Sequence, residues 1–295
     1  MPAGTAGLPV MPKVCLIVID GLRDDTARAA CSYLMSSVTG GEARIWTMRA
    51  CLPTMSAPLY ETLHTGRAPA DHGLMDNDGL RPSSGPSVFS AVKAAGGQCG
   101  VVGHCYFHTL FGGTPFDPFA HVEINDPDAP IAHARYYSMD GYDADNSVQP
   151  AEVDLCAQAW SIADRHAPEY LLLHSSSCDT LGHLHTGLGR GYVRQAEKVD
   201  AALAQLIPRL TARGYHVLVT ADHGMDDAGN HGGDAACERH VPFLSFTDRL
   251  HAGPDEILDQ RCVAPTILAL LGIPHPKTMK AAPLCRAEPR TGKLC

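Results

Sequence analysis

Short apolar runs alternate with amphipathic stretches along most of this 295-residue chain. Runs such as VCLIVI and YLLL are apolar at nearly every position, as expected of strands that are buried on both faces of a parallel sheet. The clearest amphipathic helix is predicted at 189–213, where apolar residues recur every three or four positions and Gly214 follows the last turn. This alternation predicts an α/β fold. The predicted strands are 14–19, 43–49, 99–103, 170–175, 216–221 and 241–246, and the predicted helices are 56–65, 86–96, 151–166, 189–213 and 262–272.

The segment 105–150 departs from this alternation, because it is rich in Gly, Pro, Asp and aromatic residues. Long irregular stretches inside a compact domain tend to be lids or binding loops. We therefore expect 105–150 to be a cap segment that shapes substrate choice. The length of the chain suits one α/β domain, so residues 1–295 are expected to form a single domain.

Acidic residues and a histidine directly follow three of the apolar runs. Asp20 ends the first run, and Asp179 follows YLLLHSSSC. Asp222 and His223 follow VLVTA. Ligands of open α/β sheets bind at the carboxyl ends of the strands, so these side chains are expected to converge. One such pair would also fit a turn or a capped helix. Three in one chain favour a metal site, because carboxylate oxygens and imidazole nitrogens both bind zinc-like ions well.

Two further histidines extend this set. His183 lies four residues after Asp179, which places the pair on one face if the segment is helical. His231 lies in the glycine-rich stretch GNHGG, which allows close backbone approach but also suits an ordinary loop. His240, which precedes the apolar run VPFLSF, is the rival candidate to His231.

Six segments stand in a characteristic order along the chain: IDGLR, PTMSAPLYETLHTGRAPADHG, DTLGH, TADHGM, GNHGGD and VAPTILALLGIP. Together they resemble the alkaline phosphatase superfamily, in particular its type I phosphodiesterase/nucleotide pyrophosphatase branch. The GNHGGD that follows DHGM also resembles the catalytic domain of enzymes that transfer ethanolamine phosphate to lipid anchors. The resemblance implies an alkaline phosphatase-like, three-layer α/β/α sandwich with a mostly parallel central sheet.

The resemblance also implies two divalent metal ions, Zn²⁺ ahead of Mn²⁺. One ion would activate a hydroxyl nucleophile, and the other would serve the water of the second step. Catalysis would then depend on positioning and on charge neutralisation. The implied ligands are Asp20, Asp222, His223 and the nucleophile Ser56 for the activating ion, and Asp179, His183 and His231 for the second ion.

Ser56 is the favoured nucleophile. The family places its nucleophile nine residues before the Thr of a Thr-Gly pair, and Thr65 is that Thr here. Pro53, three residues before Ser56, matches the family as well. Thr54 is the second candidate and Cys51 the third. Ser56 would also fit an N-cap of the helix that follows, and the two roles are compatible, because a helix N-terminus favours a bound phosphate.

One position departs from the family. Nucleotide pyrophosphatases commonly carry Asn three residues after the nucleophile, where this chain has Leu59. The other Asn of the family, a few residues beyond the His-Gly pair, matches Asn77. The contact to a phosphate oxygen is therefore expected from Asn77, from Arg23 or from the backbone of Ser56. The Cys-x-Pro-Ser-Arg core expected of a sulfatase is absent at the nucleophile position.

The overall composition limits the kinds of partner and the cellular setting expected of this chain. The formal net charge of −9 argues against a nucleic-acid backbone as ligand. The sequence has no apolar run of 18 residues and no secretory signal pattern, so we expect no membrane span and a cytoplasmic protein. Its eleven cysteines are scattered, with no C-x-x-C pair, which favours reduced thiols packed as small hydrophobic residues. Nothing in the pattern indicates an oligomeric state.

These features together predict a two-metal phosphoesterase that acts through a phosphoserine, most like a phosphodiesterase/nucleotide pyrophosphatase. Its partner would be a small phosphoester or phosphonate. A phosphonate or phosphomonoester hydrolase on the same core is the alternative. A catalytically silent protein that keeps its metals for stability is the alternative from another class. Ser56 argues against that class, because a closed structural metal site needs no nucleophile beside it.

Overall fold

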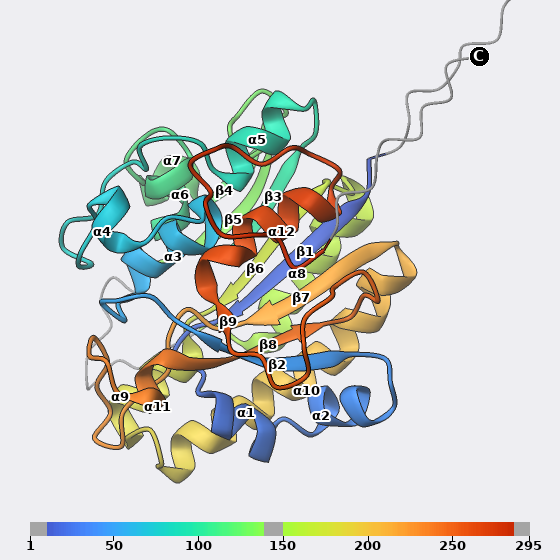
Figure 1. Ribbon diagram of the computed structural model, residues 1–295. Coiled ribbons are helices and arrows are strands. Elements are labelled where there is room, and N and C mark those ends of the chain that lie inside the picture. The colour runs from blue at the N-terminus through green and yellow to red at the C-terminus, as the bar shows by residue number, and fades with distance from the viewer. Residues whose placement is uncertain (1–10, 139–149, 286–295) are drawn as a thin grey trace, which may run out of the picture.

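The computed structural model describes residues 11–138 and 150–285, which build one nine-stranded sheet with helices on both faces (Figure 1). The sheet crosses the molecule diagonally in this view, with the blue first strand near its centre. In spatial order the strands are β4 (Glu123–Asn125), β5 (His133–Tyr137), β3 (Cys99–His104), β6 (Tyr170–Ser175), β1 (Lys13–Ile19), β7 (Tyr215–Thr220), β8 (His240–Ser245), β2 (Arg44–Arg49) and β9 (Leu258–Asp259).

The pairing is mostly parallel. Strands β5, β3, β6, β1 and β7 run parallel to one another, and β9 is parallel to β2. Antiparallel pairs join β4 to β5, β7 to β8 and β8 to β2. The central strand β1 is buried at every position from Val14 to Ile19, because parallel strands flank it and helices cover both of its faces.

Two groups of helices complete the three layers, and they confirm the predicted sandwich. One face of the sheet carries α3 (Ser56–Thr65), α5 (Val88–Ala94) and α12 (Val263–Leu270), which pack on one another. The other face carries α1 (Asp24–Ala30), α2 (Ser32–Thr39), α8 (Glu152–Arg165) and α10 (Arg190–Ala212), with α10 in contact with the other three (Figure 1). The remaining helical segments are α4 (Pro69–His72), α6 (Tyr106–Phe111), α7 (Pro118–His121), α9 (Ser177–His185), α11 (Ala236–Arg239) and the 3-10 turn η1 (Gln260–Cys262).

All six predicted strands and all five predicted helices are present, and their ends agree within two residues. The pattern missed the short helices α1 and α2, as well as α9, which carries two of the candidate ligands. Each of these is short, and α9 contains a glycine and two histidines, so none presents a long apolar stripe.

The segment 105–150 is less irregular than expected. Its described part contains α6, α7, β4 and β5, and β5 pairs in parallel with β3, so it extends the main sheet. The sequence of β5, HARYY, is too short and too polar to stand out as an apolar run. The rest of the segment, 139–149, lies outside the described residues. The role of 105–150 in substrate choice stays a prediction.

Two expectations from composition can be compared with the structure of the described residues. Within them, no helix combines the length and apolar character that crossing a bilayer requires. No disulfide joins the described cysteines, and most of these thiols are buried, for example Cys15, Cys99 and Cys178. These side chains pack as small apolar groups in the core, as predicted.

Candidate metal centre

The candidate ligands meet at the carboxyl ends of three adjacent strands in the middle of the sheet. Asp20 directly follows β1, and Asp222 lies just beyond β7. Asp179 lies in the first turn of α9, which begins just after β6. Because β6, β1 and β7 are neighbours and parallel, their carboxyl ends bring these three aspartates together from positions far apart in the sequence.

The first group of side chains surrounds the ring of His223. Its Nε2 lies 3.4 Å from Oδ1 of Asp20 and 3.3 Å from Oδ2 of Asp222. The hydroxyl of Ser56 lies 3.2 Å from the same nitrogen. All four residues are buried. The candidate atoms of Asp20, Asp222 and His223 lie within 4.8 Å of one another, as a shared cation requires.

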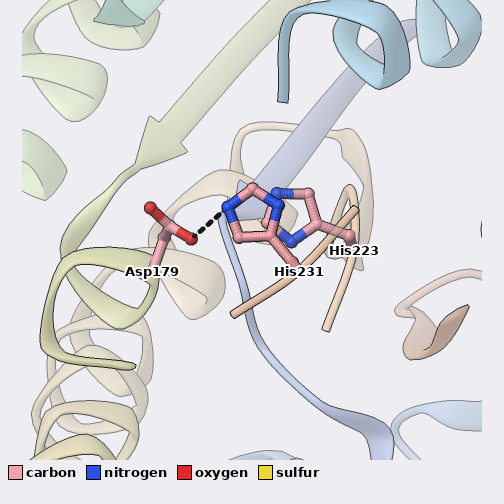
Figure 2. Close-up of side chains that lie close together, drawn as sticks. All are labelled: Asp179, His223 and His231. Carbon is pink, nitrogen blue, oxygen red and sulfur yellow. Dashed lines mark ion pairs between the residues drawn. The ribbon is translucent and has the colours of Figure 1, made fainter. Parts of the chain in front are cut away.

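The second group surrounds Asp179. Its Oδ1 lies 3.4 Å from Nε2 of His183 and 3.4 Å from Nε2 of His231. Figure 2 shows Asp179 and His231 facing each other, with the ring of His223 behind that of His231. The rings of His223 and His231 stack with centroids 3.9 Å apart, so the two groups adjoin. His183 lies at the rim, with 44% of its side chain exposed.

Backbone carbonyls determine which nitrogen of each histidine ring carries the proton. Nδ1 of His223 faces the carbonyl of Gly224 at 2.8 Å, and Nδ1 of His231 faces the carbonyl of Thr54 at 2.7 Å. Nδ1 of His183 faces the carbonyl of Gly229 at 2.8 Å. A carbonyl can only accept, so each Nδ1 must carry the proton, and in the neutral ring Nε2 keeps its lone pair. The lone pairs therefore point at the carboxylates, as metal ligation through Nε2 requires.

Three carboxylate oxygens fit this interpretation. Oδ1 of Asp20, Oδ1 of Asp179 and Oδ2 of Asp222 are buried and have no hydrogen-bond donor among the described residues. An unpartnered buried oxygen costs about 1–3 kcal/mol, and more when it is charged. The other oxygen of Asp222 accepts the N–H of Gly21 at 3.2 Å. One oxygen of each carboxylate is thus left for a cation, and the donor set suits zinc-like ions.

The electrostatics of the site also favour bound cations. Burial and the neighbouring charge of Asp20 raise the pKa of Asp222 well above its usual value. Burial, and next the adjacent ring of His231, lower the pKa of His223 to about 4, so this ring is neutral at physiological pH. The adjacent carboxylate of Asp179 raises the pKa of His183 to about 9, so a metal that binds His183 must displace a proton.

The structure separates the two hydroxyls that compete for the role of nucleophile. Ser56 is the first residue of α3 and lies beside His223. The hydroxyl of Thr54 donates to the carbonyl of Gly233 at 2.9 Å and accepts the N–H of Gly232 at 2.8 Å. Thr54 therefore anchors the loop that carries His231, and its hydroxyl is already engaged.

The candidate phosphate contacts differ in their surroundings. Oδ1 of Asn77 accepts the N–H of Ala57 at 2.9 Å, which holds this side chain next to the start of α3. Arg23 forms ion pairs with Asp25 at 2.6 Å and Asp227 at 2.8 Å, so its guanidinium is committed to joining the first turn of α1 to the segment after β7.

Leu59 packs in the core with no exposed surface, so it cannot take the place of the family's Asn. His240 opens β8 opposite Arg49, and it belongs to neither cluster of candidate ligands among the described residues.

Sequence reasoning missed several residues that support the ligands. Tyr60 and His174 both contact Asp20. Gln260 donates to the carbonyl of Asp222 at 2.6 Å and accepts the N–H of Cys51 at 3.0 Å. The polar His174 inside the apolar run YLLLHS was the one signal available beforehand, because a polar residue buried in a central strand needs a partner.

The fold and this cluster define an alkaline phosphatase-like α/β protein with a candidate metal centre at the carboxyl edge of its sheet. The chain belongs to the type I phosphodiesterase/nucleotide pyrophosphatase family, whose sequence pattern matches residues 14–240. Family membership supports a phosphoryl-transfer enzyme, a class that includes diesterases, transferases and mutases.

The chain is similar to GPI ethanolamine phosphate transferases and to phosphoglycerate mutases. GPI ethanolamine phosphate transferase 2 of Aspergillus fumigatus is 24% identical over 304 residues, covering 92% of this chain and 37% of that protein. The catalytic subunit of the Homo sapiens enzyme is also 24% identical, covering 91% of this chain and 27% of that protein. A 2,3-bisphosphoglycerate-independent phosphoglycerate mutase of Halobacterium salinarum is 30% identical over 57% of this chain and 32% of that protein. The chain therefore spans well under half the length of these relatives.

Solved structures share the fold at low identity. Murine ectonucleotide pyrophosphatase/phosphodiesterase 5 superposes with a TM-score of 0.65 at 14% identity, covering 90% of this chain and 96% of that one. A 2-O GAG sulfatase superposes with a TM-score of 0.66 at 13% identity, covering 96% of this chain and 76% of that one. These similarities establish the alkaline phosphatase-like architecture. The reaction has to be inferred from the residues of the site.

The anchoring role of Thr54 leads to a stability prediction. Thr54→Val keeps the shape of the side chain but leaves the carbonyl of Gly233 and the N–H of Gly232 without their partner. We expect it to lower the free energy of unfolding by about 1–3 kcal/mol, measured by urea unfolding. Thr54→Ser, which retains the hydroxyl, should stay close to the wild type. Equal stability of Thr54→Val and wild type would contradict the anchoring role.

Proposed function

We propose that this chain is a two-metal phosphoesterase that hydrolyses a small phosphodiester through a phosphoserine at Ser56. The observation that carries the proposal is the convergence of unpartnered carboxylate oxygens and Nε2 lone pairs beside one serine hydroxyl. A structural metal site would be closed, whereas this one has a nucleophile against it.

The residues divide between two ions. When bound, two Zn²⁺ or Mn²⁺ ions supply positive charge that activates the serine hydroxyl and neutralises the phosphoryl oxygens. The ligands proposed for them are Asp20, Asp222, His223 and Ser56 for one ion, and Asp179, His183 and His231 for the other.

Residues of the chain perform the two displacements. In the first, Oγ of Ser56 attacks phosphorus, the bond to the leaving alcohol oxygen breaks, and a phosphoserine forms. Ser56 is the first residue of α3, so the positive end of the helix dipole faces the phosphoryl group. Asn77, held beside Ala57, is placed to contact a phosphoryl oxygen. In the second displacement, water attacks the phosphoserine, which releases the phosphate product and restores the serine.

A transferase function has its own support. The relatives that cover most of this chain are named as ethanolamine phosphate transferases. Such an enzyme would form the same phosphoserine and then deliver the group to an alcohol in place of water. The two functions differ only in which acceptor reaches the phosphoserine, so they share the site described here.

Metal content is the first test. Protein purified without chelator should contain close to two transition-metal ions per chain by elemental analysis, and chelation should abolish activity. Asp222→Ala should lower kcat/KM by several orders of magnitude, because it removes a proposed ligand. Asp234→Ala, at an exposed carboxylate close to His231, should leave both metal content and rate unchanged. Metal-free protein with full activity would refute the two-metal proposal.

The nucleophile is the second test. Ser56→Ala should abolish turnover and keep the metals, because the carboxylates and imidazoles supply most of the binding energy. A slow substrate should leave a phosphoryl group on the peptide that contains Ser56, visible as a mass shift. If Ser56→Ala turns over normally, water attacks the substrate directly and the covalent mechanism must be abandoned.

The acceptor is the third test. Aryl phosphodiesters, phosphomonoesters, phosphonates and sulfates should be compared, and we expect the diester to be turned over fastest. Products should then be analysed with and without ethanolamine or glycerol. A hydrolase yields the same phosphate product in both cases, whereas a transferase yields a new diester with the added alcohol. Predominance of the new diester would replace hydrolysis by transfer.

A further inference from the structure

We propose that Tyr60, His174 and Tyr137 are positioning residues that occupy one oxygen of Asp20 and so reserve the other for the metal. This inference rests on the proposed function and assigns a task to three side chains that the reaction itself does not use; Tyr60 and His174 are buried, and Tyr137 is partly exposed. The two oxygens of Asp20 have different surroundings. Oδ2 accepts the hydrogen bond of Tyr60 and lies 3.4 Å from Nε2 of His174, whereas Oδ1 has no hydrogen-bond partner among the described residues and faces His223.

The first donor is Tyr60, whose hydroxyl donates a short hydrogen bond to Oδ2 of Asp20. Tyr60 lies one helical turn beyond Ser56 in α3. The same helix therefore carries the proposed nucleophile and the group that orients a proposed ligand. A shift of α3 would move Ser56 and Tyr60 together. The hydroxyl of Ser56 would therefore keep its position relative to the carboxylate that Tyr60 orients.

The second donor is His174, the fifth residue of β6. Its Nε2 lies 3.4 Å from Oδ2 of Asp20, and this buried nitrogen has no hydrogen-bond partner among the described residues, so Asp20 is the acceptor that it faces. The separation is long for a hydrogen bond, so this contact is weaker than the one from Tyr60.

Tyr137 decides which nitrogen of His174 carries the proton. The hydroxyl of Tyr137 accepts the N–H of Ser176 at 3.0 Å and lies 2.9 Å from Nδ1 of His174. The carbonyl of His174 is the other acceptor near this hydroxyl, at the longer distance of 3.4 Å. The phenol proton therefore goes to Nδ1, which leaves the ring proton on Nε2, facing Asp20.

Aromatic packing closes this arrangement to water. Tyr60 stacks on Phe107 with centroids 4.6 Å apart, and the ring of His174 meets Tyr60 edge-on at 4.9 Å. Gly103 of β3 leaves space for the side chain of His174, because a Cβ at position 103 would come within 2.9 Å of Cβ of His174. No water can replace a lost donor in such a niche without repacking, so each donor matters more than it would at a surface.

The consequence is a fixed geometry for Asp20. With Oδ2 held by Tyr60 and His174, the carboxylate offers only Oδ1 to a cation shared with Asp222 and His223. The second group, around Asp179, makes none of these contacts. Loss of a donor should therefore weaken one metal site and spare the other.

The test compares three hydroxyl deletions in the full-length chain. Tyr60→Phe and Tyr137→Phe remove the proposed positioning hydroxyls. Tyr170→Phe is the matched control, because its hydroxyl lies 2.9 Å from Nε2 of His64 in an equally buried pair. Tyr170 and His174 lie on the same strand, but Tyr170 is about 13 Å from His174, towards the opposite end. Metal-free protein would be titrated with Zn²⁺ against a chromophoric chelator, and Co²⁺-loaded protein would be examined by its visible absorption spectrum.

We expect Tyr60→Phe to weaken one of the two Zn²⁺ sites about ten- to a hundred-fold, with the other unchanged. The Co²⁺ spectrum should change as well, because the geometry of one site changes. Tyr137→Phe should act in the same direction more weakly, and it serves as the second variant if Tyr60→Phe fails to fold. Tyr170→Phe should match wild type in both measurements.

Two outcomes would overturn the inference in different ways. If folded Tyr60→Phe and Tyr137→Phe bind both ions as wild type does, or if Tyr170→Phe weakens the same site equally, the positioning role is wrong while the proposed function stands. If the wild-type chain binds neither ion, the proposed function fails, and this inference fails with it.

Discussion

Three aspartates converge at one edge of the sheet, and the rest of the site depends on how their negative charges are compensated. Asp20 and Asp222 are buried within reach of the same imidazole, and the charge of Asp20 raises the pKa of Asp222. Like charges this close repel strongly in a low-dielectric interior. Divalent cations bound between these carboxylates would offset the repulsion, which supports the proposed two-metal centre.

The protein prepares these ligands mainly with its backbone. Carbonyls of Gly224, Thr54 and Gly229 hold the protons of the three imidazoles on Nδ1. The side chain of Thr54 fastens the glycine-rich loop that carries His231. Without these contacts the rings would be free to turn, whereas hydrogen bonds to the backbone carbonyls fix the direction of every Nε2.

The same core serves several reactions in this family, and the departures of this chain bear on which one it performs. Leu59 is buried where nucleotide pyrophosphatases commonly have Asn, so the proposed reaction assigns the phosphate contact to Asn77 and to the start of α3. Arg23 is bound to two aspartates and is not available.

The amino-acid sequence alone determined the alternation of strands and helices and the positions of Asp20, Asp179 and Asp222 after apolar runs. These features are local, because a buried parallel strand must be apolar and the residue after it must leave the sheet. Tertiary structure alone decided that β5 joins the sheet, that Thr54 anchors a loop while Ser56 lies beside His223, and that Tyr60 and His174 share one oxygen of Asp20. Those contacts join residues far apart in the chain, and no periodicity within one segment encodes which distant donor meets which acceptor.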